Sequence, residues 1–384
     1  MVSEYAAAFD APWYHEWNRS VYGLGAVEGT VLLHDSSIHE PADLLHQHIQ
    51  HGYAADLRSR FLSTYIGHGN PRLIQAIARR YGVAESMVLT STGCTAAIWL
   101  LYRTLLQPGD HILVESPSFD MLTLFAQERG VHVERLPRSP GGFQIDPERI
   151  RALLVPETRL VVLTNGHNPT SAALDDVTLR AIADVVRPRG IPVLVDEVYG
   201  DFLPAAVHSG PAARLDPCFI SINSLTKVYG LSGLKCGWIL CSPAILARLL
   251  PMHRKYEVNS SRITHGIGSL VLDELAAFTR HWQKVLATNR AVLAEAIVSL
   301  SGAGLLEGWI PEYGCMFFPR VVGVADTRHF AKWLWNGYRV VVAPGEFFDA
   351  PGHIRIGFGQ PAATLASGLA RLAEGLAMYP RTVQ

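Results

Sequence analysis

The sequence has few charged residues and no long hydrophobic run, and each shortage excludes a class of protein. Only 17% of its 384 residues are charged, and the formal net charge is −1. Such a balance gives no electrostatic attraction for nucleic acid or for an anionic membrane surface. No apolar run approaches the roughly 20 residues that a membrane-spanning helix needs. We therefore expect neither nucleic acid nor a membrane among the partners.

Cysteine is scarce as well, and its spacing does not indicate disulfides. The five cysteines are Cys94, Cys218, Cys236, Cys241 and Cys315. They are odd in number and scattered, without a Cys-x-x-Cys pair, which fits reduced thiols. The first residues also lack the basic and apolar segments of a signal peptide. A cytoplasmic location is therefore expected.

Three histidines that lie close in the sequence, His46, His48 and His51, raise the alternative of a metal site. On a helix, His46 and His48 would point in different directions, and no ligand quartet surrounds them in the sequence. Isolated histidines usually have structural or solvated roles, so no metal is expected.

The chain does contain a regular alternation of strands and helices. Strands expected at 87–90, 111–115, 159–164 and 191–195 are near-continuous apolar runs, as buried parallel strands should be. Helices are expected between them, for example over 96–106. The pattern predicts an α/β fold with a doubly wound, mostly parallel sheet, in which ligands bind at the carboxyl ends of the strands.

After about residue 254 the pattern changes to longer helices and shorter strands. The expected elements are helices within 263–300 and over 362–377, and strands near 340–342 and 353–358. This indicates a smaller α+β domain, which we expect the N-terminal arm to complete. The predicted large domain is 45–254, and the predicted small domain is 1–44 plus 255–384.

A loop between two apolar segments, 218–222 and 239–241, holds Lys227 and Lys235 together with three glycines and two serines. Glycine permits close approach of the backbone. A lysine held between buried strands is costly while charged, so its pKa should fall. A neutral lysine amine is the usual Schiff-base nucleophile for carbonyl groups. From the loop alone, solvated surface lysines are an equal alternative.

Other polar residues fall where the expected strands end. Gly93-Cys94-Thr95 leads into the helix expected from residue 96, where free N–H groups and the helix dipole favour phosphate, although an ordinary helix cap would look the same. The residues that follow later strands are Phe119, Asn168, Asp196 and Tyr199. Because carboxyl ends of parallel strands share one edge of a sheet, we expect these side chains to form one site.

The lysine loop resembles the lysine motif of the class I/II aminotransferases, which are fold-type I pyridoxal-phosphate enzymes. The matching residues are Ser224-x-x-Lys227 and then Gly230-Leu231-x-Gly233-Leu234-Lys235-x-Gly237-Trp238. Further matches, in chain order, are Tyr65, Gly69-x-Pro71, Gly93-Cys94-Thr95, Phe119, Asn168-Pro169-Thr170, Asp196-x-x-Tyr199 and Arg355. Each piece alone is weak evidence, but the resemblance extends in this order from about Tyr65 to Phe358.

The resemblance implies pyridoxal 5'-phosphate as the cofactor and gives roles to the residues around its ring. Lys227 would form the Schiff base and carry a proton between substrate and cofactor carbons. Asp196 would pair with the ring nitrogen, and Asn168 and Tyr199 would hydrogen bond to the phenolic oxygen. Phe119 would stack on the ring. The alternatives are a helix cap for Asp196 and a core position for Phe119.

The resemblance also implies how phosphate and substrate are held. The implied phosphate ligands are Gly93, Cys94, Thr95, Ser224 and Lys235. Tyr65 would reach the phosphate of the other subunit, which implies a homodimer with shared active sites. Arg355 would clamp the substrate α-carboxylate, with Asn168 beside it. The alternative for Arg355 is a surface position on its strand.

Three positions depart from the family pattern. Lys235 stands where arginine is usual, and Ser171 stands where glycine usually follows Asn-Pro-Thr. The family's early substrate-side glycine has no clear match, and Asp35-Ser36-Ser37-Ile38 occupies that neighbourhood. These differences concern the phosphate geometry and the pose of the substrate.

The activity implied is a pyridoxal-phosphate-dependent aminotransferase that moves an amino group between an α-amino acid and a 2-oxo acid. The same residues would also serve a lyase, a decarboxylase, or an oxidative or cyclising step in amino-acid-derived biosynthesis. A ligand-sensing domain of a regulator is a further alternative, but an arm of about thirty residues leaves no room for a helix-turn-helix. Side-chain specificity stays open, because Arg262 would suit either a distal carboxylate or a structural ion pair.

Overall fold

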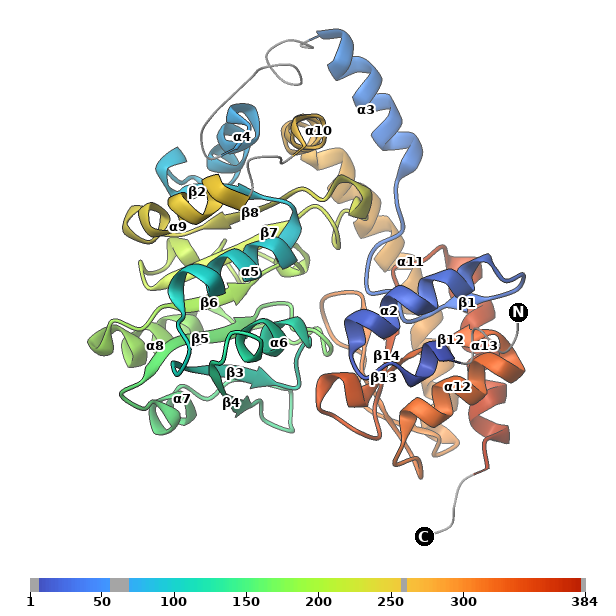
Figure 1. Ribbon diagram of the computed structural model, residues 1–384. Coiled ribbons are helices and arrows are strands. Elements are labelled where there is room, and N and C mark those ends of the chain that lie inside the picture. Colours follow the sequence, from blue (N-terminus) through green and yellow to red (C-terminus); the bar gives the residue numbers. More distant parts are fainter. Residues whose placement is uncertain (1–6, 56–68, 257–260, 381–384) are drawn as a thin grey trace.

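The computed structural model describes residues 7–55, 69–256 and 261–380. Its largest element is a seven-stranded sheet with the order β2-β8-β7-β6-β5-β3-β4 (Figure 1). The strands are β2 (Val88–Ser91), β3 (His111–Ser116), β4 (His132–Pro137), β5 (Thr158–Thr164), β6 (Val193–Asp196), β7 (Phe219–Ser224) and β8 (Gly237–Leu240). Strand β8 runs antiparallel to both of its neighbours, β2 and β7, and the other pairs in this sheet are parallel. The predicted doubly wound, mostly parallel α/β fold is confirmed.

Helices cover both faces of the sheet, and alternate strand residues supply a separate core on each face. Val162 packs on the side of α5, α6 and α9, whereas Val161 and Leu163 pack on the side of α7 and α8. These helices are α5 (Gly93–Leu105), α6 (Met121–Gln127), α7 (Pro147–Leu153), α8 (Asp176–Val186) and α9 (Pro243–Tyr256). Since successive side chains of a strand point to opposite faces, a sheet covered on both sides needs continuous apolar strands.

The smaller part of the molecule combines the N-terminal segment with the end of the chain, on the right of Figure 1. Its helices are α2 (Tyr14–Tyr22), α12 (Thr327–Tyr338) and α13 (Ala362–Met378), joined by the long α11 (Leu275–Gly302). Its strands are β1 (Val31–Leu32), β9 (Leu306–Glu307), β10 (Met316–Phe317), β11 (Arg320–Val321), β12 (Val340–Val341), β13 (Ala343–Pro344) and β14 (Ile354–Gly357). Strand β1 pairs in parallel with β12, which fixes the N-terminal segment to this part.

Three further helices lie at the top of Figure 1, namely α3 (Ala42–Ala55), α4 (Pro71–Tyr81) and α10 (Arg262–Asp273). Helix α3 projects from the rest, and none of its residues is buried. The predicted domain borders at residues 45 and 254 fall inside α3 and α9, and they stay predictions. In the described parts of the chain, no helix combines the length and apolarity needed to cross a membrane.

Two elements of the sheet part differ from the sequence-based expectation. Strand β4 was not expected, because it is a polar edge strand in which Leu136 alone is buried, and so it lacks an apolar run. Helix α5 was expected from residue 96 but begins at Gly93. The small residues that look like a turn in the sequence therefore form the first turn of the helix.

Candidate active site

The carboxyl ends of β5, β6 and β7 bring predicted site residues to one edge of the sheet. Thr164 at the end of β5 pairs with Asp196 at the end of β6, and Asp196 pairs with Ile222 of β7. Asn168 lies just beyond β5, and Ser224 is the last residue of β7. The expectation that these strand ends share one edge is confirmed.

Lys227 lies in the loop after β7, with its amine against the N-terminal segment. Its Nζ is 3.3 Å from the Ser37 Oγ and 3.5 Å from the Ser36 Oγ. The Ile38 N–H donates to the Lys227 carbonyl oxygen at 2.9 Å. Burial lowers the pKa of Lys227, as the sequence predicts for a lysine between buried strands. A lower pKa leaves more of the amine neutral and nucleophilic.

Asp196 is a buried carboxyl group that forms no ion pair with any described residue. It is 7% exposed, and its Oδ1 accepts a hydrogen bond from the Val198 N–H at 3.0 Å. Burial raises the pKa of Asp196 to about 7, while the positive charge of Lys227 acts in the opposite direction. A further cation at this position would favour the ionised carboxylate.

The start of α5 brings together most of the residues expected to hold phosphate. A Cβ at Gly237 would lie 2.8 Å from the Gly93 backbone, so β8 passes directly beside the helix start. Burial raises the pKa of the Cys94 thiol, and Ser224 is close enough to act on it in the opposite direction, so the end of β7 lies near the same turn. The Thr95 side chain is exposed there. The first N–H groups of a helix have no intrahelical acceptor, so an anion can bind them.

Lys235 lies in the loop between β7 and β8. It adopts a left-handed conformation, with φ of 49°, and its side chain is exposed. Within the described chain, no side chain forms a hydrogen bond with its ammonium group. It lies two residues before Gly237, whose backbone packs against the start of α5, and its role toward phosphate stays a prediction.

Arg355 is fully buried on β14, so the alternative of a solvated surface arginine is wrong. Its Nη1 donates to the Asn168 Oδ1 at 2.7 Å. Its Nη2 donates to the Tyr14 hydroxyl at 2.6 Å and to the His34 carbonyl oxygen at 2.9 Å. Its buried Nε has no partner among the described residues. All of these acceptors are neutral, so the guanidinium charge is left for an anion.

Two residues that contact the predicted site were not identified from the sequence. Tyr14 of α2 lies with its ring 5.1 Å from the Arg355 guanidinium carbon and meets the Phe119 ring edge-on at 5.9 Å. Ser36 accepts a hydrogen bond from the Tyr199 hydroxyl at 2.8 Å. The aromatic-rich arm was the signal for Tyr14, and the departure from the family pattern near residue 36 was the signal for Ser36.

Residues 33–38 pass between the two parts of the molecule and are fixed to both. The Gly357 N–H donates to the Leu33 carbonyl oxygen at 2.6 Å. A Cβ at Gly357 would lie 1.6 Å from the Asp35 carbonyl oxygen, so only glycine allows this approach. At the other end, the hydrogen bond to the Lys227 carbonyl oxygen ties the segment to the lysine loop.

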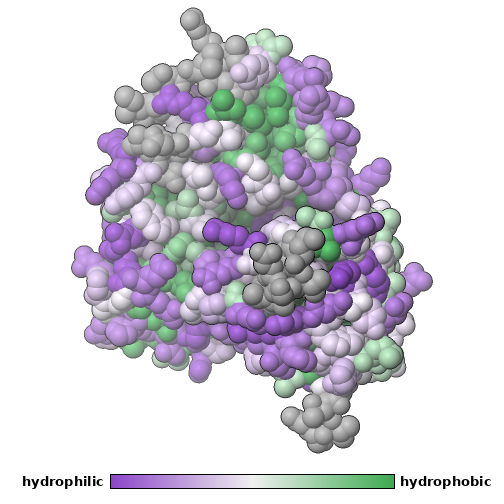
Figure 2. Space-filling model, turned by 45° about the vertical axis from the view of Figure 1, so that its right-hand side comes forward, coloured by the Kyte–Doolittle hydropathy of each residue, from purple (hydrophilic) through white to green (hydrophobic). Residues whose placement is uncertain are grey.

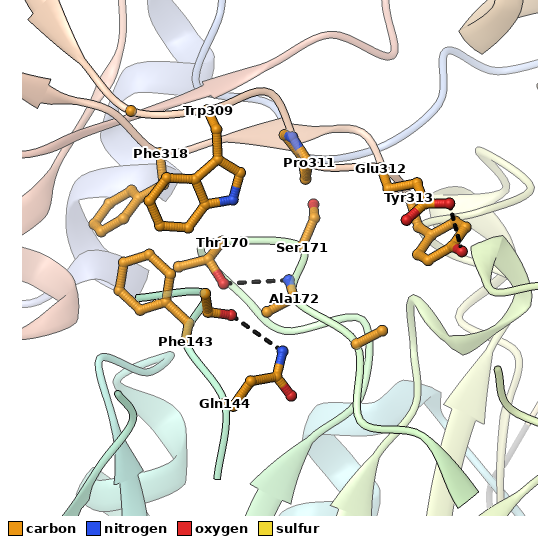
Figure 3. A pocket seen from close by; sticks show the side chains of 13 residues that line it. Phe143, Gln144, Thr170, Ser171, Ala172, Trp309, Pro311, Glu312, Tyr313 and Phe318 are labelled. Atoms are coloured by element: carbon orange, nitrogen blue, oxygen red, sulfur yellow. Dashed lines mark hydrogen bonds between the residues drawn. The ribbon is translucent and has the colours of Figure 1, made fainter. Parts of the chain in front are cut away.

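A pocket of about 270 Å³ lies beside the candidate site, at the junction of the two parts (Figure 3). Residues 142–144 and 170–173 line it from the sheet part, and residues 308–309, 311–313 and 318 line it from the smaller part. The Ser171 Oγ donates across this junction to the Met316 carbonyl oxygen at 3.1 Å. The serine that replaces the family's usual glycine therefore joins the two parts.

Two residues discussed from the sequence have no assigned position in the site. Tyr65 lies outside the described residues. Arg262 is the first residue of α10, and the choice between its two roles stays open.

The fold and the shared sheet edge define a pyridoxal-phosphate-dependent enzyme of the aspartate-aminotransferase-like type. The chain belongs to the family of aminotransferase class I and II, whose model matches residues 31–372. A PLP-dependent aminotransferase from Streptococcus suis superimposes with a TM-score of 0.86 at 23% identity, over 96% of this chain and 98% of that chain. The PLP-dependent cyclase OrfR superimposes with a TM-score of 0.83 at 25% identity, over 96% and 97% of the two chains.

Curated relatives cover most of the chain and carry different activities. Capreomycidine synthase of Streptomyces vinaceus is 28% identical over 321 residues, which are 82% of this chain and 80% of that protein. Arginine–pyruvate transaminase of Pseudomonas aeruginosa is 27% identical over 318 residues, which are 79% of this chain and 80% of that protein. The family and its cofactor are therefore established, while the named relatives catalyse different reactions.

The described residues fit pyridoxal phosphate chemically. Asp196 is a buried carboxyl group without an ion pair, which suits a protonated ring nitrogen. The α5 start offers N–H groups and small side chains for a phosphate, and Lys227 offers an amine whose pKa is lowered.

Proposed function

We propose that this protein is an aminotransferase that moves an amino group between an α-amino acid and a 2-oxo acid. The observation that carries the proposal is the gathering of an amine, a carboxyl group and a guanidinium at one edge of the sheet. The charge of Lys227 acts on the pKa of Asp196, and the charge of Arg355 acts on the pKa of Lys227. When bound, pyridoxal phosphate supplies an aldehyde that condenses with amines and a ring that accepts electrons.

Lys227 would hold the cofactor and then move a proton at the substrate Cα. Its lowered pKa suits both tasks, because a neutral amine is a nucleophile and also a base. The hydroxyls of Ser36 and Ser37 lie close enough to its Nζ to orient it. Lys227 would thus be both the attachment point and the general base.

The other residues would bind and orient. Asp196 would keep the ring nitrogen protonated, with Asn168 and Tyr199 near the phenolic oxygen and Phe119 against the ring. Arg355 would hold the substrate carboxylate through its guanidinium N–H groups, of which Nε has no partner among the described residues. The phosphate would lie on the residues at the start of α5, with Ser224 and Lys235 beside them.

An isotope experiment tests this proposal. The enzyme is incubated with a ¹⁵N-labelled amino acid and an unlabelled 2-oxo acid, across a panel of donors. Transamination moves the label into the new amino acid, and a Lys227→Ala protein serves as the control without transfer. Release of the label as ammonium from every reactive donor would contradict the proposal.

A cyclising reaction is the second candidate, and it is favoured by the likeness to capreomycidine synthase and to the cyclase OrfR. Its first step would use the same Lys227 base and the same Arg355 clamp. The isotope experiment separates the two candidates, because a cyclised product retains the label and requires no 2-oxo acid.

We also propose that the enzyme works as a homodimer with shared sites. Helix α3 has no buried residue, and Tyr53 and Ile263 are 43% and 52% exposed. Figure 2 shows a hydrophobic area in the upper part of the molecule, at the height of α3, α4 and α10 in Figure 1. A monomer rarely exposes a contiguous apolar area unless a partner covers it.

Hybrid dimers test the sharing of sites. Lys227→Ala subunits mixed with Tyr65→Ala subunits should regain part of the activity, because one site in each hybrid then has both residues intact. An active species that sediments as a monomer would contradict the shared site.

A further inference from the structure

Asp35 lies between the residues proposed to hold the substrate carboxylate and the cofactor. On one side, the His34 carbonyl oxygen accepts a hydrogen bond from the Arg355 Nη2 at 2.9 Å. On the other side, the Ser36 Oγ is 3.5 Å from the Lys227 Nζ. The Asp35 carboxylate is close enough for its charge to raise the pKa of both Arg355 and Lys227. Asp35 is therefore in the middle of the segment that connects the two binding groups.

The protein itself satisfies the Asp35 carboxylate only in part. Its Oδ1 accepts a hydrogen bond from the Ser37 N–H at 3.0 Å, and its charge adds to the effect of burial in raising the pKa of the neighbouring Tyr22. Among the described residues, no arginine, lysine or histidine forms an ion pair with it. Asp35 is half-buried and Tyr22 is 45% exposed, so a ligand can reach both side chains. A partly desolvated carboxylate with free acceptor positions binds a cation more strongly than an exposed one.

The position of this carboxylate is fixed by the backbone. Gly357 packs against the Asp35 carbonyl oxygen at a distance that excludes any Cβ. An amino acid with its carboxylate on Arg355 and its amino group at Lys227 has residues 33–38 along one side. The side chain of this amino acid therefore extends into a space that Asp35 borders, and Asp35 places a fixed negative charge there.

We propose that Asp35 selects amino acids with a cationic side chain, an ammonium or a guanidinium group, by binding that cation. The proposal rests on the proposed function, since it requires the substrate to be held by Arg355 and Lys227. A neutral side chain gains no ion pair at Asp35, and an acidic one is repelled. Selectivity arises from both the attraction and the repulsion.

A matched pair of amino acids tests this selectivity. Arginine and citrulline have the same length and shape, but only arginine carries a side-chain charge. Each is titrated into the holoenzyme without a 2-oxo acid, and the absorbance change of the bound cofactor gives the half-saturating concentration. For the parent enzyme we expect arginine to saturate at a concentration at least about tenfold lower than citrulline, the scale of a charged hydrogen bond.

Three variants complete the test. In Asp35→Asn, the arginine preference should fall to within about twofold through weaker arginine binding, and Asp35→Glu should retain part of the preference. Glu28→Gln removes the same charge from an exposed position and should keep the parent ratio. Melting temperature and cofactor content report whether each variant is folded, while the parent comparison needs no variant.

Two results would overturn the proposal. One is a parent enzyme without preference for arginine. The other is an equal loss of affinity for arginine and citrulline in Asp35→Asn. That result is expected if Asp35 only offsets the charges of Lys227 and Arg355. Failure of the proposed function gives a different result. If the arginine preference persists while no 2-oxo acid forms, transamination is disproved and the role of Asp35 is supported.

Discussion

The two halves of the candidate site are built in different ways. Asp196 and Ser224 end neighbouring strands, so the hydrogen-bond ladder of one sheet fixes their spacing, and Lys227 follows in the loop after β7. Arg355 and Tyr14 come from distant segments and meet through a side-chain hydrogen bond at 2.6 Å. The sheet half, formed by Lys227, Asp196 and Ser224, contains the groups suited to the cofactor. The arm half, formed by Arg355 and Tyr14, contains the groups suited to the substrate. Substrate choice can therefore change in the arm while the sheet edge stays the same.

Replacing Lys227 should give the largest effect, because it removes the chemistry of the sheet half. In Lys227→Ala we expect turnover to fall by several orders of magnitude. Borohydride should fix the cofactor to the peptide that contains Lys227 in the parent and to no peptide in the variant, as mass spectrometry would reveal. A variant that still yields a fixed cofactor would disprove the assignment of the lysine.

Replacing Asp196 should alter the pH dependence of stability in the cofactor-free protein. Burial raises the pKa of Asp196 from its ordinary value of 3.8 to about 7, so the folded state disfavours the ionised carboxyl group. The resulting destabilisation should appear as pH rises from about 4 to 7 and reach at most about 4 kcal/mol. Asp196→Asn should remove it, so the variant should gain in melting temperature over the parent between pH 5 and pH 8. The same variant should bind the cofactor more weakly. An equal change in melting temperature of parent and variant between pH 5 and pH 8 would argue against the buried charge.

Lys235 tests whether an exposed residue belongs to the sheet half. We predict that Lys235→Ala weakens cofactor binding by roughly 1.5–3 kcal/mol, the scale of a charged hydrogen bond. Equilibrium dialysis measures this directly. Equal affinity in variant and parent would exclude Lys235 as a phosphate ligand.

Tyr14 should give the smallest effect and should act in the arm half alone. Tyr14→Phe keeps the ring against Arg355 but removes the hydroxyl, so the hydrogen bond from Arg355 is lost together with the 3.2 Å bond to Asn18. We expect KM for the amino acid to rise by about fivefold, near 1 kcal/mol, with little change in kcat. A change in cofactor affinity instead would mean that the two halves are not separate.

The sheet half was largely predictable from the sequence because its signals are local. Apolar runs mark the strands, and polar residues directly after them must meet at one edge. Strand β4 escaped prediction because an edge strand needs no apolar run, and five of its six residues are exposed or half-buried. The same locality explains why the start of α5 was identified although its first turn was misplaced.

The arm half could not be predicted in the same way. Tyr14 and Arg355 are separated by 341 positions in the chain, and no periodicity in the sequence connects them. Arg355 was identified through resemblance, and residues 35–38 were noticed only because they depart from a family pattern. Their contacts with Lys227, Tyr199 and Gly357 depend on how the two parts of the molecule pack together.

A single-turnover experiment tests the proposed transfer most directly. The enzyme is mixed with an α-amino acid and no 2-oxo acid, and cofactor spectrum and products are followed together. The proposed function predicts one equivalent of 2-oxo acid, a stable amine-form cofactor, and return of the aldehyde spectrum when a 2-oxo acid is added. If a broad panel of amino acids yields only ammonia, carbon dioxide, peroxide or a cyclised product while the aldehyde form persists, the protein is not an aminotransferase in its activity.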